Sequence, residues 1–430
     1  METALLTGLS TLAAAPVSAG LARAHTAKNR LLRILVGTPF VPDRNGRHGG
    51  SVYLGTYIEA LARHAEVAVL SLQSDSDPAP GRHLCQALAR FETVPHRQLR
   101  DLAGAARMAH RARMLQHWGL QRLPLLVAKH RSKAFARRLR ALVADIQPDV
   151  VLLEQAVMAQ YIPELRGTPT VFADHERGDP VPARVGFGGA GAARDAALWA
   201  RYVRRCYPMA TLVQALNTED ARHLSSLLGI TVEVRPLIVP LPDETVDPGR
   251  APARALFLGN YLHSPNTVAA IRLATDVWPL VRQRLPQAEL WLAGLHPTAE
   301  VQALAGAGIR VVGAVDDLAA AFAQARTLLA PVFSGSGVRI KLLTAMAHGL
   351  PVVSNDLGLR GVDALPPAVQ RAESNADLAT AVLHHLENAA AAGAAGKSAR
   401  QWAEQNLSPE RVAIAQLARL AEIASGASAR

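Results

Sequence analysis

Short runs of valine, isoleucine and leucine alternate along this chain with longer stretches rich in alanine, leucine and arginine. Short apolar runs are typical of strands buried on both faces of a sheet, and the stretches between them are typical of helices. The first series of expected strands comprises 31–36, 67–70, 150–153 and 170–173. The second series comprises 255–258, 289–293, 310–312, 327–330 and 351–354. Strand-helix alternation predicts parallel sheets between helical layers, so we expect an α/β fold with two doubly wound domains facing across a cleft.

Five prolines lie between positions 236 and 252. Because proline fixes φ and lacks a backbone donor, this density favours a linker. The chain before the first expected strand lacks the basic start of a secretory signal, so we expect a disordered N-terminal extension there. The Ala/Gly-rich residues 389–396 are expected to be weakly structured, ahead of a helix from Pro409 to Ala424. The predicted organisation is an extension (1–30), a first domain on the acceptor side (31–235), a linker (236–252), a second domain that binds the nucleotide sugar (253–408), and a terminal helix with its tail (409–430).

The net charge of +11 is concentrated in one segment. Residues 96–140 contain twelve lysines or arginines and one acid, Asp101. A solvated helical face is the plain interpretation of such a run. The segment also suits contact with anionic lipid headgroups, and both interpretations stay open. The apolar neighbours that could touch a membrane are Trp118, Leu120, Leu123, Leu125 and Leu126. No zinc-finger, helix-turn-helix or RNA-binding signature accompanies the charge, so nucleic acid is not an expected partner.

Neither a membrane span nor a cysteine framework is predicted. No stretch approaches the roughly 20 uninterrupted apolar residues that a spanning helix needs. The two cysteines, Cys85 and Cys206, lie far apart and match neither a metal-ligand motif nor a dense disulfide pattern. These features are typical of a cytoplasmic protein, and the basic segment leaves open peripheral attachment at the inner face of the membrane.

The segment 328–353, LLAPVFSGSGVRIKLLTAMAHGLPVV, is the most informative in the chain. It predicts a strand, a small-residue loop, a helix and a second strand. Gly335, Ser336 and Gly337 allow backbone N–H groups to approach a ligand, and the helix that follows directs its positive end at them. We therefore predict an anion site here, with an ordinary loop-to-helix junction as the alternative.

The helical spacing indicates which of the two cations, Lys341 or Arg339, lies nearer to the predicted anion site. A helix that begins near Gly337 places Lys341 and Thr344 on the same face as that glycine. Arg339 lies about 200° around the helix from Gly337, at about 100° per residue. Lys341 is therefore the stronger candidate for contact with the anion, and Arg339 the weaker.

A second small-residue loop follows the first expected strand. Gly46 to Ser51 precede an amphipathic helix that runs to Arg63. Gly49 and Gly50 could bring backbone N–H groups against the same ligand from the opposite domain. Two such loops could hold one diphosphate across the cleft; a flexible surface loop is the alternative.

His175 follows the expected strand 170–173, where cleft residues belong. Its neighbours Asp174 and Glu176 could suggest a metal site, but consecutive side chains of an extended chain diverge, so we expect none. A role for His175 at the reaction centre or on a donor hydroxyl is a hypothesis. The alternative is a structural histidine.

The chain resembles the retaining glycosyltransferases of group 1, or family 4, which have the GT-B fold of two Rossmann-like domains. The resemblance lies, in the family's order, in residues 46–51, 209–224, 256–297 and 313–362. It implies a nucleoside diphosphate sugar as donor and no metal, because fixed N–H dipoles and cations take the charge of the leaving group. Gly294 and Gly313 would border the nucleotide base. The donor-binding set implied by the resemblance is Gly49, Gly50, Gly259, Asn260, Gly294, Gly313, Gly335, Ser336, Gly337, Arg339, Lys341 and Thr344.

Two departures from the family pattern concern the donor. Members usually carry two glutamates eight positions apart, where this chain has Ser336 and Thr344. Thr344 replaces the carboxylate that is expected to hold the donor ribose. The arginine and lysine often found after the first strand of the second domain are here Asn260 and Pro265.

Three functions are consistent with these observations. The first is transfer of a sugar to a glycan or lipid-linked acceptor, in cell-surface polysaccharide synthesis. The second is a catalytically degenerate scaffold that binds a glycan or a partner transferase, which Thr344 favours. The third is a nucleotide-sugar epimerase of the same fold, which would need more acid/base candidates in the cleft than the sequence offers.

Overall fold

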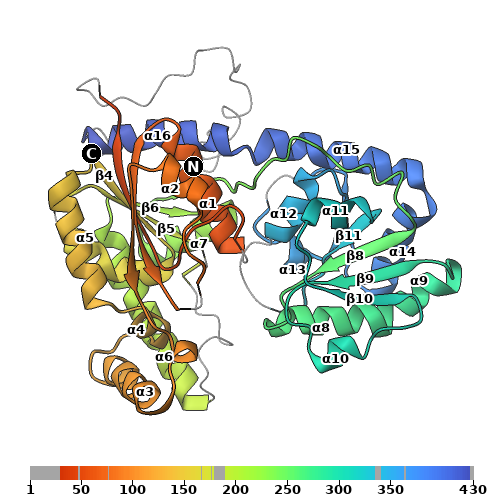
Figure 1. Ribbon diagram of the computed structural model, residues 1–430, viewed down its shortest axis with the longest axis horizontal. Coiled ribbons are helices and arrows are strands. Elements are labelled where there is room, and N and C mark those ends of the chain that lie inside the picture. Colours follow the sequence, from red (N-terminus) through yellow and green to blue (C-terminus); the bar gives the residue numbers. More distant parts are fainter. Residues whose placement is uncertain are drawn as a thin grey trace.

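Two α/β lobes lie side by side in the computed structural model (Figure 1). The structure describes residues 30–46, 49–75, 77–165, 167–175, 177–178, 189–334, 340–362 and 365–426. Of the extension expected over 1–30, only Arg30 lies within these ranges, and its guanidinium forms an ion pair of 2.6 Å with Asp149.

The first lobe contains a seven-stranded parallel sheet in the order β3-β2-β1-β4-β5-β6-β7. The strands are β1 (Arg33–Thr38), β2 (Glu66–Gln73), β3 (Arg90–Pro95), β4 (Val150–Glu154), β5 (Thr170–Asp174), β6 (Leu212–Ala215) and β7 (Val232–Val234). The helices of this lobe are α1 (Gly49–Ala62), α2 (Arg82–Ala87), α3 (Gly104–Gly119), α4 (Leu125–Lys129), α5 (Lys133–Ile146), α6 (Gly189–Cys206) and α7 (Thr218–Leu228), of which α3 projects from one end (Figure 1). The described residues of this lobe also form 3-10 helix over Leu99–Asp101, Ala156–Leu165 and Tyr207–Met209.

The second lobe contains a six-stranded parallel sheet in the order β10-β9-β8-β11-β12-β13. Its strands are β8 (Arg254–Leu258), β9 (Glu289–Ala293), β10 (Ile309–Gly313), β11 (Thr327–Leu329), β12 (Val352–Ser354) and β13 (Val369–Arg371). Its helices are α8 (Ser264–Arg272), a π-helical turn (Leu273–Val277), α9 (Trp278–Arg284), α10 (Ala299–Gln302), α11 (Leu318–Ala323), α12 (Ile340–Ala347), α13 (Asp356–Leu359) and α14 (Asn375–Glu387). Helices α15 (Ala389–Asn406) and α16 (Pro409–Ala424) end the described chain.

All nine strands expected from the apolar runs are present, with ends shifted by a few residues. Four strands were not predicted: β3, β6, β7 and β13. Three of these are edge strands, which lack a neighbour on one side and carry charged residues. The fourth, β6, contains the buried Gln214, whose amide exchanges two hydrogen bonds of 3.1 Å with Gln416 of α16. A buried polar residue interrupts the apolar run that marks a strand. Because its hydrogen-bond partner lies on a distant helix, the local sequence pattern does not reveal the strand.

The expectation of a weakly structured segment over 389–396 is wrong, because these residues form the first half of α15. Alanine has the highest intrinsic helix propensity, which outweighs the two glycines in this segment. Gly396 lies where the helix packs closely on other backbone, because a Cβ there would lie 2.3 Å from the carbonyl oxygen of Gly349. Gly393 makes ordinary contacts with Asp247 and Gly249. Gly396 is therefore a packing residue of a helix.

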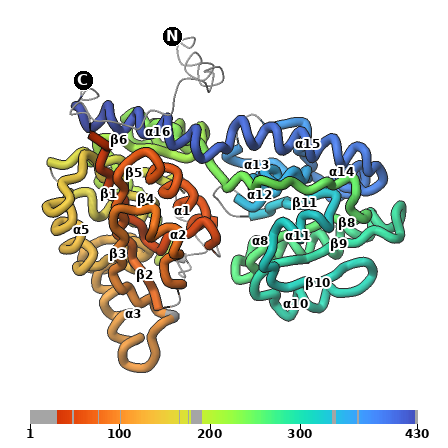
Figure 2. The backbone as a smooth tube through the Cα atoms, turned by 45° about the horizontal axis from the view of Figure 1, so that its top comes forward, coloured from red at the N-terminus to blue at the C-terminus, as the bar shows by residue number. Residues whose placement is uncertain are grey.

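The terminal helix expected from Pro409 to Ala424 is confirmed as α16. It leaves the second lobe after α15 and lies against the first lobe, beside α1 (Figures 1 and 2). Arg419 binds Glu233 of β7 at 2.6 Å, and Leu417 and Leu420 are buried. The last helix of the chain thus holds the two lobes together.

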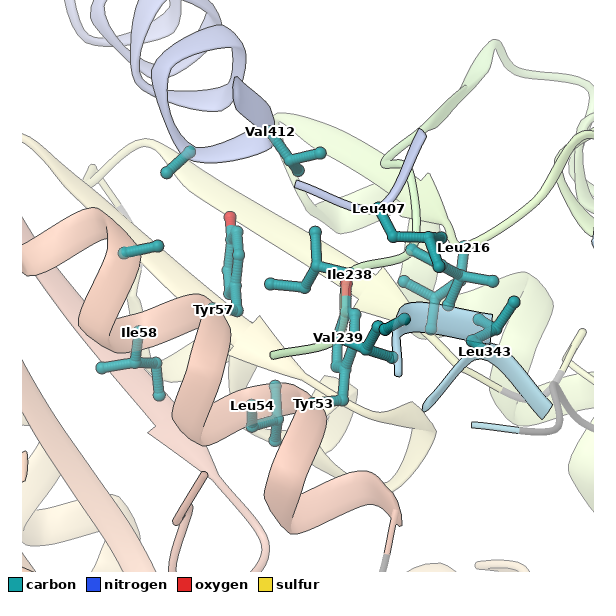
Figure 3. Close-up of a cluster of buried hydrophobic side chains, with 14 of the residues drawn as sticks. Tyr53, Leu54, Tyr57, Ile58, Leu216, Ile238, Val239, Leu343, Leu407 and Val412 are labelled. Carbon is teal, nitrogen blue, oxygen red and sulfur yellow. The ribbon is translucent and has the colours of Figure 1, made fainter. Parts of the chain in front are cut away.

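The stretch 235–253 between the two sheets has neither helix nor strand. Its Ile238 and Val239 are fully buried between the tyrosines of α1 and Leu343 of α12 (Figure 3). Among the residues that the structure describes, no helix is both long and apolar enough to cross a bilayer.

We expect Leu420→Ala to destabilise the protein by about 3 kcal/mol, because it removes a fully buried leucine between α16 and the first lobe. Ile414→Ala on the same helix is the control, since that side chain is 44% exposed and should change little. Urea unfolding of both variants measures the difference. Equal losses of stability would show that α16 is not held by this face.

Candidate functional site

Lys341 lies in the first turn of α12 and reaches the carboxyl end of β8. Its ammonium nitrogen Nζ donates to the carbonyl oxygen of Leu258 at 2.5 Å and to Oδ1 of Asn266 at 3.3 Å. The same nitrogen lies 4.5 Å from the centroid of the Phe257 ring. The predicted cation is thus at a strand end, where ligands of doubly wound sheets bind. Four members of the predicted phosphate site, Gly335, Ser336, Gly337 and Arg339, lie outside the described residues.

Thr344 lies one turn further along α12 and is half-buried. Its hydroxyl donates to the carbonyl oxygen of Ile340 at 2.9 Å, a bond that threonine often forms inside helices. The position therefore offers a hydroxyl already bonded to the helix backbone, in place of a carboxylate.

Three predicted glycines come together at the ends of neighbouring strands β8, β9 and β10. The amide of Gly294 donates to the carbonyl oxygen of Gly313 at 2.6 Å, and the amide of Gly259 donates to that of Ala293 at 3.0 Å. A Cβ at Gly294, whose φ is +137°, would lie 1.6 Å from the carbonyl oxygen of Gly259. Only glycine fits there, so the row presents bare backbone at the sheet edge.

Asn260 continues this edge into the turn before α8. Its Oδ1 accepts from the amide of Leu262 at 3.1 Å, and its carbonyl oxygen accepts from Nδ2 of Asn266 at 2.9 Å. Asn266 also contacts Lys341, so this turn and α12 are joined by side-chain hydrogen bonds.

The helices that follow the two small-residue loops meet at their N-terminal ends. Gly49 is the first residue of α1, and Ile340 is the first residue of α12. A Cβ at position 49 would lie 3.2 Å from Cβ and Cγ1 of Ile340, so the two helix starts are in contact across the lobes. Gly50 follows in the same turn of α1. Both helices direct their positive ends toward this contact.

His175, directly after β5, belongs to a buried cluster at the carboxyl edge of the first sheet. Its Nε2 lies 2.9 Å from Oε2 of Glu154, the last residue of β4. Arg235, directly after β7, donates through Nη1 to Oε1 of Glu154 at 2.7 Å and through Nη2 to Oε2 at 2.6 Å. Its Nε donates to the hydroxyl of Tyr53 at 3.1 Å, and its guanidinium lies 4.3 Å from the centroid of the Tyr57 ring.

The charges of this cluster compensate one another. Glu154 and Arg235 are at most 1% exposed. Burial alone raises the pKa of Glu154, but the charge of Arg235 and the hydrogen bonds from Arg235 and His175 outweigh burial and lower that pKa to about 2. Burial raises the pKa of the Tyr53 hydroxyl to about 12, so this group stays protonated. The cluster contains an ionised salt bridge beside neutral tyrosines.

Glu154 and Arg235 were not among the predicted site residues. A signal for the first exists: a single carboxylate ends the apolar run VVLLE. Carboxyl ends of parallel strands gather at one edge, so this glutamate could have been grouped with His175. Arg235 follows β7, a strand that the apolar pattern did not predict, so the sequence did not indicate that it lies at the same sheet edge.

A second contact between the lobes lies at α7. Glu219 accepts from Arg177 of the first lobe at 3.0 Å and from Arg360 of the second lobe at 2.6 Å. Glu219 and Arg360 border an open cavity of about 480 Å³ beside α13. The cavity is lined by Glu219, Asp356, Leu357, Leu359, Arg360, Gly361, Val362, Leu365 and Arg371.

Comparison with known proteins relates the second lobe to one family. Residues 252–388 match the family described as glycosyl transferases group 1. A phosphatidyl-myo-inositol mannosyltransferase of Mycobacterium tuberculosis (strain ATCC 25618 / H37Rv) is 33% identical over 194 residues, which are 41% of this chain and 48% of that protein. The chain therefore spans about half the length of the curated relatives it matches.

Solved structures share the whole arrangement at low identity. A sucrose-phosphate synthase from Thermosynechococcus elongatus is 16% identical with a TM-score of 0.64, over 90% of this chain and 98% of that one. The Anabaena protein HepE, solved in complex with UDP and glucose, is 12% identical with a TM-score of 0.56, over 91% and 100%. These similarities confirm the predicted fold of two Rossmann-like domains, the GT-B fold.

We expect the free energy of unfolding to fall as the pH is lowered from 4.5, the ordinary value for Glu154, toward about 2, its value in the folded protein. A depressed folded pKa contributes stability above the unfolded pKa and loses it as the carboxylate is protonated. At about 1.4 kcal/mol per pH unit, the loss from this group is about 3 kcal/mol. Urea unfolding at a series of pH values, followed by circular dichroism, measures it.

The double variant Glu154→Leu/Arg235→Met is the matched control, because replacing a buried ion pair by apolar groups is often tolerated. It keeps every other carboxylate, so its pH dependence should be shallower by the contribution of Glu154. The same slope in both proteins would contradict the assignment. Arg235→Met alone should cost about 3–5 kcal/mol, since it leaves a buried carboxylate unpaired.

Proposed function

We propose that this chain is a sugar transferase. Through residues 252–388 it belongs to the group 1 glycosyltransferases, the retaining family 4 with the GT-B fold. It transfers a sugar, with retention, from a nucleoside diphosphate sugar to a glycan or lipid-linked acceptor of the cell surface. The contact of Gly49 with Ile340 carries this proposal, because it brings the positive ends of two helices from opposite lobes together. The ammonium group of Lys341 lies one residue further along α12.

This arrangement suits the charge that develops when a diphosphate leaves. Backbone N–H groups at two helix starts are fixed dipoles, and they need no reorganisation during the reaction. Lys341 now donates to a neutral carbonyl oxygen of Leu258. An anionic phosphate oxygen is a stronger acceptor, so a bound donor would compete well for this ammonium group.

The remaining donor contacts follow from the same edges of the two sheets. The glycine row of Gly259, Gly294 and Gly313 offers a flat backbone surface for a nucleotide base. His175 keeps 8% of its side chain exposed at the edge of the first sheet and is the candidate for contact with the donor sugar. The Anabaena structure contains UDP, so UDP-sugars are the first donors to test.

A catalytically degenerate scaffold is the second candidate, and Thr344 favours it. The hydroxyl of Thr344 is bonded to its own helix, so position 344 supplies no carboxylate for a ribose. The epimerase alternative is less well supported. An epimerase needs groups that exchange protons near neutral pH, whereas the pKa of Glu154 is about 2 and both its oxygens accept hydrogen bonds.

We expect nucleoside diphosphates to raise the melting temperature of the protein and Lys341→Ala to weaken their binding about 10- to 100-fold, the loss of one charged hydrogen bond. A ligand at 100 times its dissociation constant adds about 2.7 kcal/mol of stability. Thermal shift with a panel of nucleoside mono- and diphosphates measures both effects.

Lys397→Ala is the control, since Lys397 is exposed on α15, away from α12's first turn. Unchanged diphosphate affinity in Lys341→Ala would contradict the phosphate assignment. If no nucleotide shifts the melting temperature of the unaltered protein, the scaffold is favoured.

The basic segment supports a membrane-bound acceptor. Helix α3 projects from the first lobe (Figure 1), and none of its side chains is buried. Met108 and Leu115, seven positions apart on one face, are 63% and 50% exposed. Arg107 and Arg111 lie on adjoining positions and form no ion pair within the described part of the chain.

The base of α3 is anchored to the rest of the lobe. The indole nitrogen of Trp118 donates to Oδ1 of Asp195 in α6 at 2.9 Å, and Arg194 stacks over the same indole at 4.3 Å from its centroid. The helix is thus held at its end while its apolar and cationic face stays in solvent. We propose that this face binds an anionic membrane surface peripherally, which suits a lipid-linked acceptor.

We expect the protein to sediment with vesicles that contain anionic phospholipid and not with purely zwitterionic vesicles. Arg107→Glu/Arg111→Glu should weaken this binding strongly, because each cation near the surface contributes about 1 kcal/mol and each reversal adds repulsion. Co-sedimentation at low and high salt measures it.

The control Arg310→Glu/Lys397→Glu makes the same change of charge on exposed residues of the second lobe. Equal losses in both variants would show that total charge matters and α3 does not. Binding that does not depend on anionic lipid would refute the proposal that α3 binds an anionic membrane surface.

A further inference from the structure

We infer that Glu154 and Arg235 are positioning residues that hold His175 with its ring proton on Nε2, so that Nδ1 is the atom offered to the substrate. The inference rests on the proposed function for the identity of that substrate, a donor sugar hydroxyl. The tautomer itself can be measured without any substrate.

The hydrogen bonds of Glu154 determine which ring nitrogen carries the proton. Oε2 of Glu154 lies 2.9 Å from Nε2 of His175 and also accepts from Nη2 of Arg235 at 2.6 Å. An ionised carboxylate can only accept, so the ring nitrogen beside it must be the donor. In the neutral imidazole the other nitrogen, Nδ1, is then an acceptor.

Arg235 makes this arrangement rigid. Its two bonds to Glu154 keep the carboxylate ionised and fix the plane of its oxygens. Tyr53 accepts from Nε of Arg235, and the edge of the same tyrosine ring meets the ring of His175 at a right angle, with centroids 5.4 Å apart. The imidazole is therefore held by a hydrogen bond at one nitrogen and by an aromatic ring beside it.

A buried ion pair is an unfavourable way to fill this part of the core. Burying two charges carries a desolvation penalty that apolar residues of similar volume avoid. The cluster lies where strands β4 and β5 end, at the carboxyl edge of the first sheet. Arg235 also begins the stretch that connects the lobes, so the residue that orients Glu154 is attached to the interlobe connection. A change in the relative position of the lobes would move Arg235 and, through Glu154, the imidazole of His175.

The direct test is NMR of protein with 15N-labelled histidine rings, at a pH high enough to give neutral rings. The nitrogen shifts distinguish the two tautomers, and the signal lost in His175→Ala assigns the residue. We expect the proton on Nε2 in the unaltered protein. A proton on Nδ1 would overturn the inference, whatever the protein's activity.

The role of the ion pair is tested in the double variant Glu154→Leu/Arg235→Met. We expect a mixture of the two tautomers at His175, because the acceptor for Nε2–H is gone. Arg235→Lys, which keeps the charge beside Glu154, should retain the single tautomer. A single Nε2–H tautomer in the double variant would show that Glu154 does not determine it.

The substrate contact is tested by two amide replacements. The side-chain amide of asparagine overlaps Nδ1 of histidine, and that of glutamine overlaps Nε2. We expect His175→Asn to retain about tenfold more of kcat/KM for sugar transfer than His175→Gln, with both variants folded by circular dichroism. The reverse order would overturn the assignment of Nδ1. If the unaltered protein transfers no sugar, the proposed function is refuted, but the tautomer measured by NMR still stands.

Discussion

The buried ion pair between Glu154 and Arg235 is the interaction on which the carboxyl edge of the first sheet depends. Neither charge has water to solvate it, so each is stable only because the other lies within hydrogen-bonding distance on two atoms. The pair joins the end of β4 to the start of the interlobe stretch. Through it, the position of His175, the orientation of Tyr53 and the path of the chain between the lobes are set together.

The relation of the two lobes rests on contacts from distant parts of the chain. Ile238 and Val239 lie between α1 and α12, so the interlobe stretch is part of a continuous apolar core (Figure 3). Helix α16 returns from the second lobe to the first and packs beside α1. Such packing places the starts of α1 and α12 against each other, and the proposed diphosphate site rests on this geometry.

One of the departures from the family pattern lies on α12, at Thr344. Lys341 supplies a cation in the first turn of α12, which would suit a leaving diphosphate at the proposed site. Thr344 supplies a hydroxyl already bonded to Ile340, where members of the family usually have a carboxylate. A transferase that binds its donor mainly through the diphosphate and a scaffold that has lost ribose recognition both follow from this difference, and they differ in nucleotide affinity.

The sequence by itself determined the nine apolar strands, the two-domain fold and the positions after strands where His175, Gly259, Gly294 and Gly313 lie. These features depend on local periodicity, and the carboxyl ends of parallel strands always share an edge. Only the tertiary structure decided the partners. Lys341 meets Leu258 at a separation of 83 residues, Arg235 meets Glu154 at 81, and Gln416 meets Gln214 at 202. A local pattern specifies which face of an element is buried, but the surface that covers it depends on how distant elements pack.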